Sequence, residues 1–298
     1  MSRDIFIRVV LSLVIIFLIF ALHRLMTIRI PEPRPALQRE QPLLFAHRGG
    51  SALAPENTLT AFRVGASFQA DALELDVRLS ADDVVMVFHD ETLERTTNGV
   101  GKVREHTLAE LKALDAGYHF TNDNGATYPY RGQGVTIPTL AEVYAEFPDL
   151  LINVDIKDPL PEAAERLAEV IAEAGATDRT IVGSFHDDIL THFRKIAPDV
   201  ATAAGETETR AFYFLQWLKL GRLHRPLSDV YQIPPRYGRF QLATPSFIAS
   251  AHKLNQAVHF WTIDDPAEMR GLLDMGADGI ITDHPDLALE VFREYGYK

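Results

Sequence analysis

Residues 72–90 read ALELDVRLSADDVVMVFHD, a run in which acidic and apolar residues alternate before a histidine appears. Because the side chains of a strand alternate between its two faces, Glu74 and Asp76 share one face. The link that follows is too short for a crossover helix, so we expect residues 84–88 to return as an antiparallel strand. We expect this hairpin to fold about a turn at residues 81–84, with two residues at its centre, which places Asp76 opposite His89. An imidazole would then stand beside two carboxylates, as in a metal-assisted reaction centre.

The composition describes a long, acidic chain without thiols. With 298 residues and 47% hydrophobic composition, it could form two average domains or one large α/β barrel. A formal net charge of -12 makes capture of nucleic acid unfavourable, so we expect no nucleic-acid partner. The absence of cysteine excludes disulfides, thiolate ligands and cysteine nucleophiles. Any metal ion must therefore be bound by oxygen or imidazole.

The chain begins with an apolar stretch. Residues 5–22 read IFIRVVLSLVIIFLIFAL, and only Arg8 and Ser12 interrupt it, which suits the roughly 17 to 25 residues of a transmembrane helix. No small-residue cleavage site follows, so an uncleaved anchor is favoured over a signal peptide or a buried helix. We expect a transmembrane anchor within 1–24, a proline-rich stalk at 25–42 and a single-pass membrane localisation. The distribution of arginines leaves the side of the membrane open.

Beyond the stalk, short β-rich runs alternate with helical patterns, which is typical of a parallel sheet wrapped by helices. Nine strands are expected, at 43–47, 72–77, 84–88, 150–156, 180–184, 200–204, 229–233, 258–263 and 279–282. The strand of the hairpin is the extra one, which leaves eight for a TIM-type (β/α)8 barrel over residues 43–298. Helices are expected at 58–68, 161–174, 187–196, 244–254 and 266–275, the first with Asn57 as its cap.

Two segments interrupt this alternation. Residues 90–140 are long and glycine-rich with one short helical pattern, and insertions of this kind usually cover a site, so we predict a lid. Residues 209–223 contain four aromatic side chains, Phe212, Tyr213, Phe214 and Trp217. They are compatible with an interfacial helix, but a buried helix of the barrel is the favoured interpretation.

Several short motifs follow one another in a fixed order. They are HRG at 47–49, PENT at 55–58, ELD at 74–76, HD at 89–90, NVDIK at 153–157, GSF at 183–185, WT at 261–262 and GIITD at 279–283. In this order and spacing the chain resembles the glycerophosphodiester phosphodiesterase family, and the resemblance covers nearly everything from His47 to Asp283. In a barrel of this type, catalytic residues gather where the strands end, which is where His47 and Arg48 fall.

The resemblance implies a metal-dependent phosphodiesterase in which each kind of residue has a role. It implies that His47 and His89 shuttle protons, that Arg48 and Lys157 neutralise the phosphate, and that Glu74, Asp76 and Asp155 bind one divalent ion. Oxygen ligands favour Ca²⁺ or Mg²⁺ over Zn²⁺. In the family the first attack is commonly assigned to the substrate's own glycerol hydroxyl, which gives a cyclic phosphate that water then opens.

Other positions leave alternatives open. Glu56, Phe185 and Trp261 are candidates for the substrate pocket, although Glu56 also suits a helix cap and Trp261 also suits packing at the barrel rim. Asp155 stands where the family usually carries Glu, and the missing methylene puts the metal preference in question. Asp283 is expected to be a structural acid at a strand end.

The expected activity is hydrolysis of glycerophosphodiesters to an alcohol and glycerol phosphate. The nearest alternative is a lysophospholipase D that acts on lysophospholipids at the membrane with the same residues. An alternative from another class is a non-catalytic membrane protein that binds phosphodiesters. The presence of both His47 and His89 argues against the last.

Overall fold

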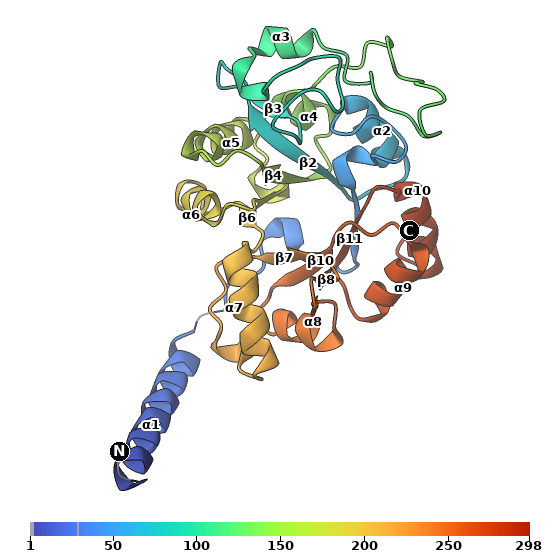
Figure 1. Cartoon of the computed structure of the whole chain (residues 1–298). Coiled ribbons are helices and arrows are strands. Elements are labelled where there is room, and N and C mark those ends of the chain that lie inside the picture. The colour runs from blue at the N-terminus through green and yellow to red at the C-terminus, as the bar shows by residue number, and fades with distance from the viewer. Residues whose placement is uncertain (1–2, 29) are drawn as a thin grey trace.

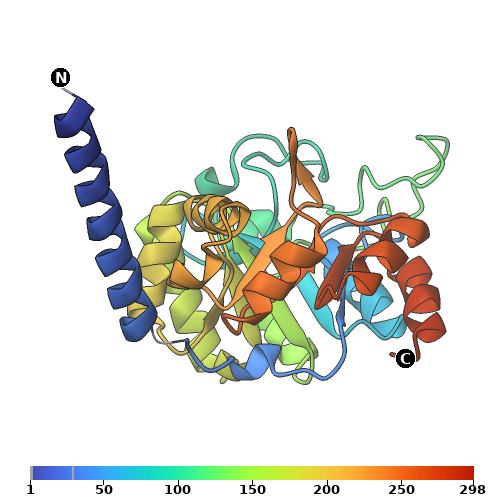
Figure 2. The same cartoon turned by 90° about the horizontal axis from the view of Figure 1, so that it is seen from below.

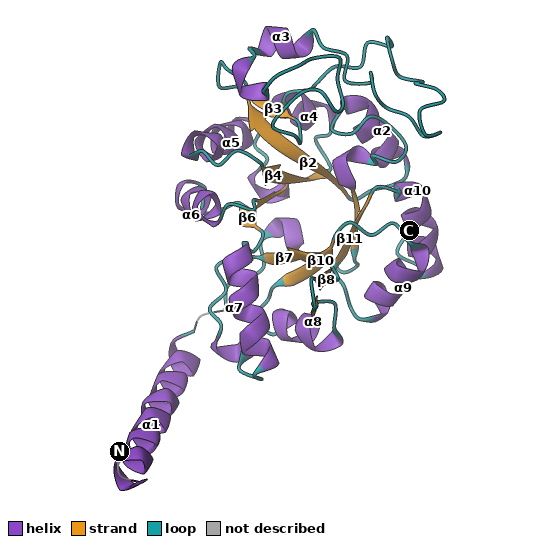
Figure 3. Ribbon diagram, in the orientation of Figure 1, coloured by secondary structure: helices purple, strands orange, loops and turns teal. Residues whose placement is uncertain are grey.

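Eight parallel strands form a barrel, as predicted. In the order in which they pair, they are β6 (Ala201–Thr202), β5 (Thr180–Gly183), β4 (Leu151–Ile156), β2 (Ala72–Leu79), β1 (Leu43–Ala46), β11 (Gly279–Thr282), β10 (Ala257–Phe260) and β7 (Val230–Ile233). A parallel bridge between Ala203 and Val230 joins the two ends of this order. The computed structural model describes residues 3–28 and 30–298, without the side chains at 17, 18, 20, 21 and 25. Figure 3 shows the strands around a centre with the helices outside them.

The extra strand β3 (Val85–Val87) pairs antiparallel with β2, which confirms the predicted hairpin. Its predicted register is wrong by one residue, because the amide of Phe88 donates to the carbonyl of Asp76 at 2.9 Å and Phe88 therefore lies opposite Asp76. The physical reason is the turn. Asp83 adopts a φ of 60° and closes a three-residue loop, whereas the prediction assumed a two-residue turn.

Helices cover the outside of the barrel (Figure 1). They are α2 (Leu59–Ser67), α4 (Leu140–Glu146), α5 (Pro161–Glu173), α6 (Asp187–Ile196), α7 (Glu206–Trp217), α8 (Pro245–His252), α9 (Pro266–Asp274) and α10 (Pro285–Glu294). The five predicted helices correspond to α2, α5, α6, α8 and α9. The cap of α2 is Thr58, whose hydroxyl accepts a hydrogen bond from the amide of Ala61, and not the predicted Asn57.

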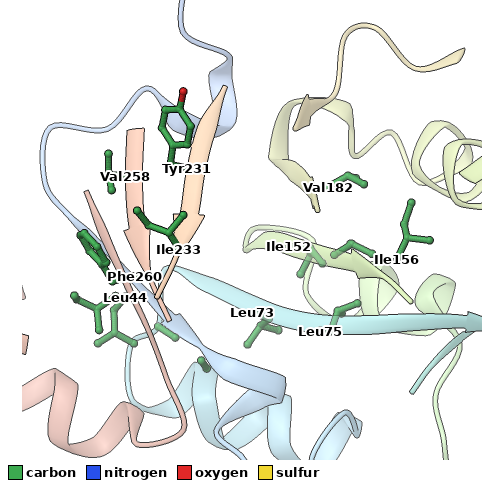
Figure 4. Close-up of a cluster of buried hydrophobic side chains, with 14 of the residues drawn as sticks. Leu44, Leu73, Leu75, Ile152, Ile156, Val182, Tyr231, Ile233, Val258 and Phe260 are labelled. Atoms are coloured by element: carbon green, nitrogen blue, oxygen red, sulfur yellow. The ribbon is translucent and has the colours of Figure 1, made fainter. Parts of the chain in front are cut away.

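Apolar side chains on both faces of the strands form the core. On the outer face they pack against the helices, and Figure 4 shows Leu44, Leu73, Leu75, Ile152, Ile156 and Phe260 among them. On the inner face a second cluster fills the barrel, with Phe45, Ala72, Leu151, Ile181, Val230 and Ile281. Glu74 and Asp76 alternate with Leu73 and Leu75 along β2. They are therefore on the inner face, as the two-residue period predicted.

The N-terminal residues form a long helix, α1 (Arg3–Thr27), which projects from the barrel in Figures 1 and 2. Across the residues that the structure describes, none of the helices combines the length and the apolar character that a bilayer span requires. The predicted transmembrane anchor, the membrane attachment through it and the single-pass localisation are therefore wrong. Only residues 9–22 lie between Arg8 and His23, and Ser12 interrupts them, whereas a span needs about 20 apolar residues. Residues 1, 2 and 29 of the predicted anchor and stalk lie outside the described residues.

The proline-rich segment that we predicted as a stalk packs against the barrel. The guanidinium of Arg34 donates to the carbonyl of Pro198 and lies 3.6 Å from a carboxylate oxygen of Asp229. Ala36 is buried. The segment therefore leads directly into β1 from the end of the barrel where the strands begin.

The insertion at 90–140 leaves the barrel after β3 and returns at α4. It contains the short helix α3 (Leu108–Lys112) and an apolar cluster of its own that includes Phe88, Leu93, Val103 and Leu111. In Figure 2 it rises from the same end of the barrel as a second hairpin, β8 (Arg236–Tyr237) with β9 (Phe240–Gln241), which the sequence did not reveal. Its role as a lid stays a prediction.

Gly49 offers a test of how the loop after β1 packs. It has a φ of 88°, and a Cβ atom placed on it would lie 2.7 Å from the carbonyl carbon of Ala61 in α2. We expect Gly49→Ala to lower the free energy of unfolding by about 1–3 kcal/mol, measured by urea denaturation, because strain and overpacking add. Gly276→Ala is the control, since its φ is 93° but its Cβ would meet only an ordinary contact at 3.8 Å. An equal loss in both variants would show that overpacking contributes nothing.

Candidate functional site

A cavity of about 630 Å³ opens at the end of the barrel where the strands terminate. Nine of the ten predicted site residues line it: His47, Arg48, Glu74, Asp76, His89, Asp155, Lys157, Phe185 and Trp261. The tenth, Glu56, is not among the lining residues, but it contacts Arg48, which is. Residues from five barrel strands or the loops after them, together with His89 after β3, thus meet in one place, which is the usual position of the site in such barrels.

The pairing of β2 with β4 brings the acids together. Asp76 is the register partner of Asp155, and Glu74 is the partner of Asn153. Asp76 is 1% exposed, and its Oδ2 accepts a hydrogen bond of 2.8 Å from the side-chain amide of Asn57. The amide oxygen of Asn57 in turn accepts the backbone N–H of Asp76 at 3.2 Å. Asn57, which we predicted as a helix cap, therefore orients a buried carboxylate.

A lysine ammonium lies between two of these acids. Nζ of Lys157 donates to Oδ2 of Asp155 at 2.6 Å and lies 2.8 Å from Oδ1 of Asp76. Burial lowers the pKa of Lys157, but the two carboxylates outweigh burial and raise it above its ordinary value. In the described part of the chain, no three His, Cys, Asp or Glu side chains are arranged to hold a metal ion. The predicted ligands share one cavity, and Lys157 takes the space between two of them.

The acids of the cavity differ in their electrostatic surroundings. Burial raises the pKa of Glu74 to about 7, and burial also raises the pKa of Asp155. For Asp76 burial acts in the same direction, but Lys157 and Arg48 outweigh it and lower the pKa. Oδ1 of Asp155 is buried without a hydrogen-bond partner. Carboxylate oxygens that the neighbouring cationic side chains do not fully compensate are suitable ligands for a hard divalent cation.

Each of the two predicted catalytic histidines has a carboxylate partner. Nδ1 of His47 lies 2.5 Å from Oδ1 of Asp283, and Nδ1 of His89 lies 2.6 Å from Oδ1 of Asp90. Burial lowers the pKa of His47, but Glu74 and Asp283 outweigh it, so the net pKa is raised.

Asp283 is thus more than a structural acid at a strand end. Besides His47, it accepts a hydrogen bond from the hydroxyl of Ser51, and its own amide donates to Asp264 at 2.9 Å. The sequence signal for this role was its position directly after β11, which is next to β1 in the barrel.

Sequence reasoning missed one further residue, Arg95 of the insertion. Its guanidinium donates to Asp90 through Nε at 2.5 Å and to Glu56 through two nitrogens at 2.6 and 2.8 Å. Burial raises the pKa of Asp90, but the bonds from Arg95 and His89 outweigh burial and lower it to about 2. Nothing in the local pattern around Arg95 separated it from other arginines.

Glu56 connects Arg95 with Arg48, which lines the cavity. Its Oε1 accepts a hydrogen bond of 2.8 Å from Arg48, whose Nε lies 3.3 Å from Asp76. The carboxylate of Glu56 is thus engaged by both Arg48 and Arg95, and its place in the substrate pocket stays a prediction. Four charged residues and a histidine form one continuous series: Arg48, Glu56, Arg95, Asp90 and His89.

Two aromatic rings stand at the rim of the charged cluster. Phe185 and Trp261 pack edge to face with their ring centroids 5.9 Å apart. Nζ of Lys157 lies 5.6 Å from the ring centroid of Phe185. Phe185 is 64% exposed, so its ring faces the open cavity.

Comparisons with known proteins identify the family to which this chain belongs. A sequence model of the Glycerophosphoryl diester phosphodiesterase family matches residues 47–287. A glycerophosphodiester phosphodiesterase from Caldanaerobacter subterraneus is 34% identical over 269 residues, which cover 85% of this chain and 99% of the relative.

Two solved structures extend the likeness to the fold. The glycerophosphoryl diester phosphodiesterase domain of an uncharacterized protein from Mycobacterium tuberculosis superposes with a TM-score of 0.75 at 23% identity, over 84% of this chain and 99% of that one. A phosphodiesterase from Oleispira antarctica, solved in complex with the product sn-glycerol-3-phosphate, gives a TM-score of 0.68 at 25% identity, over 85% and 97%. The chain belongs to the glycerophosphoryl diester phosphodiesterase family and is a phosphoric diester hydrolase.

Proposed function

We propose that this chain hydrolyses glycerophosphodiesters to glycerol phosphate and an alcohol with the help of a divalent cation. The observation that carries the proposal is the pair of carboxylate-bound imidazoles, His47 and His89, in one cavity with Arg48 and Lys157. The family relationship supports the same reaction class. The alternative of a non-catalytic membrane protein is set aside, because the chain belongs to a family of hydrolases and the predicted anchor is wrong.

The cationic side chains bind the phosphate. A phosphodiester monoanion repels an oxygen nucleophile, so its nonbridging oxygens must be neutralised before attack. Arg48 offers a planar guanidinium whose position is fixed by Glu56, and Lys157 offers a point charge. In this proposal Lys157 moves from Asp76 and Asp155 to the phosphate.

The two imidazoles move the protons. One accepts the proton of the attacking hydroxyl as its oxygen bonds to phosphorus, and the other donates a proton to the departing alcohol as the second P–O bond breaks. Asp283 and Asp90 accept hydrogen bonds at Nδ1 of their histidines. This contact fixes each tautomer and leaves Nε2 for the substrate.

Glu74, Asp76 and Asp155 would hold the cation, which we propose to be Ca²⁺ or Mg²⁺ because every ligand is a carboxylate oxygen. When bound, such an ion supplies charge stabilisation at the nonbridging oxygens. The buried oxygen of Asp155 without a partner supports its place in this set.

Removing either histidine tests the proposed hydrolysis. We expect His47→Ala and His89→Ala each to lower kcat for glycerophosphocholine by about 10² to 10⁴, measured as released choline, because the proton transfer is lost. A chelator should abolish the activity of the wild type, and Ca²⁺ or Mg²⁺ should restore it. His252→Ala is the control, since His252 pairs with Asp278 at the surface. Wild-type turnover in either site variant would refute the assignment.

The contact between His47 and Asp283 predicts a measurable titration. Because Asp283 raises the pKa of His47, Asp283→Asn should lower that pKa, which NMR of the imidazole resonances against pH would report. His252, whose pKa is raised by Asp278, serves as the reference and should not change. An unchanged pKa at His47 would mean that the two residues are not coupled.

Arg95 should act on catalysis through Asp90 and Glu56. We expect Arg95→Met to reduce kcat by about 10- to 100-fold, as for other residues that orient catalytic groups, and to change the pH profile. Arg95→Lys should recover only part of this loss, because a lysine cannot serve both carboxylates with a planar fork. Arg104→Met removes another arginine of the insertion, which pairs with Asp83, and should keep the wild-type kcat. Equal kinetics in all three variants would contradict the role of Arg95.

A further inference from the structure

Two amide side chains meet inside the barrel at the bottom of the cavity. Asn153 on β4 and Gln232 on β7 both line the cavity, and Asn153 is 3% exposed. Nε2 of Gln232 donates to Oδ1 of Asn153 at 2.8 Å, so the two side chains join across the inside of the barrel. Asn153 belongs to the NVDIK motif, but no step of the proposed hydrolysis uses either residue.

His259 on β10 holds the amide of Gln232 from another side. Nδ1 of His259 lies 3.4 Å from Nε2 of Gln232. Burial lowers the pKa of His259 to about 4, so its ring is neutral at neutral pH and Nδ1 can accept the second N–H of that amide. The NH2 group of Gln232 therefore has two acceptors, which together fix its orientation.

The bond between Asn153 and Gln232 leaves one donor and one acceptor unused. They are Nδ2 of Asn153 and Oε1 of Gln232, and neither has a hydrogen-bond partner within the described residues. They are also not among the polar atoms of these residues that are buried without a partner, so both are accessible from the cavity. Gly183 adjoins this oxygen without a side chain to cover it, since a Cβ atom placed on Gly183 would lie 3.7 Å from Oε1.

A donor beside an acceptor fits a hydroxyl group, because a hydroxyl both donates and accepts hydrogen bonds. The oxygens of an ionised phosphodiester only accept, and an ammonium group only donates. Turning both amides by 180° would exchange their roles and would still present one donor and one acceptor to the cavity. The pair therefore selects a hydroxyl in either orientation.

The amide pair lies below the carboxylates of the proposed cation site. Asn153 is the register partner of Glu74 and precedes Asp155 by two residues, on the same face of β4. Two residues of a strand span about 6.6 Å, which is similar to the reach of glycerol phosphate. A glycerol hydroxyl at the amide pair is thus compatible with a phosphate group near the level of these carboxylates.

The end of the cavity toward α7 is mixed in character. Its lining includes Glu206, Arg210 and Phe214. Phe214 is 50% exposed, whereas Phe212 is buried. Helix α7 is therefore only partly buried, which differs from the favoured prediction of a buried helix. This end offers acidic, basic and apolar groups together, whereas the amide pair matches one kind of group.

We propose that Asn153 and Gln232 bind a hydroxyl group of the glycerol moiety, so that this protein selects glycerophosphodiesters over alkyl phosphodiesters. The inference rests on the proposed hydrolysis and names the residues that recognise the glycerol of its substrate. The alcohol that leaves would extend toward α7.

The test compares sn-glycerol-3-phosphate with propyl phosphate, which carries the same charged group but no hydroxyl. Calorimetry in the presence of Mg²⁺ should show that the wild type binds glycerol phosphate at least about tenfold more tightly, because each hydrogen bond contributes several-fold. Gln232→Met and Asn153→Leu should each reduce this preference by at least about fivefold and change the affinity for propyl phosphate by less than about twofold.

Gln133→Met is the matched control, because Gln133 is exposed in the insertion and is not among the residues that line the cavity. This variant should keep the preference of the wild type. A wild type that does not prefer glycerol phosphate, or an unchanged preference in either site variant, would overturn the proposal. An equal loss of affinity for both ligands would reveal a general structural role and would overturn it as well.

An assay of turnover separates this inference from the hydrolysis itself. If the preference is present in the wild type and lost in both site variants, but glycerophosphocholine is not hydrolysed, the hydroxyl site is supported and the proposed hydrolysis fails. If glycerophosphocholine is hydrolysed but the site variants keep the preference, the hydrolysis is supported and the hydroxyl site fails.

Discussion

The buried carboxylate of Asp76 is the group on which the arrangement of the site depends. An ionised acid inside a barrel is unfavourable unless cations and hydrogen bonds compensate it. Asp76 has such partners from three other segments: Asn57 before α2, Arg48 after β1 and Lys157 after β4. One desolvated charge therefore holds three loops at the mouth of the barrel, and the residues that they carry are placed together.

The neighbouring acids are compensated less completely. Burial raises the pKa of Glu74 to about 7, and one oxygen of Asp155 has no hydrogen-bond partner. When these carboxylates are ionised, they repel an anionic substrate. In the proposed function, a divalent cation held by their oxygens would compensate them together with Arg48 and Lys157.

The barrel could be predicted from the sequence because apolar residues recur every two residues in strands and every 3.6 residues in helices, and both periods are visible in short stretches of sequence. The shared face of Glu74 and Asp76 followed from the same rule. Features set by single backbone angles or by distant side chains could not be predicted. The positive φ of Asp83 shifted the hairpin register, and the contacts of Arg95 join residues up to 39 positions apart. Residues 5–22 reach the length of a transmembrane helix only if the charge of Arg8 is disregarded.

The position of β3 outside the barrel has a consequence for how the fold tolerates change. Because β3 pairs only with β2 among the named strands, β2 and β4 are direct neighbours, although the chain between them is long. The segment between them therefore leaves the barrel from β2 and rejoins it at β4, the strand next to β2. Its length can therefore vary, or a foreign domain can replace its outer loops, while Asp76 and Asp155 keep their spacing. The tether through Arg95 limits how freely this region can be rebuilt, because it connects the insertion to residues beside the cavity.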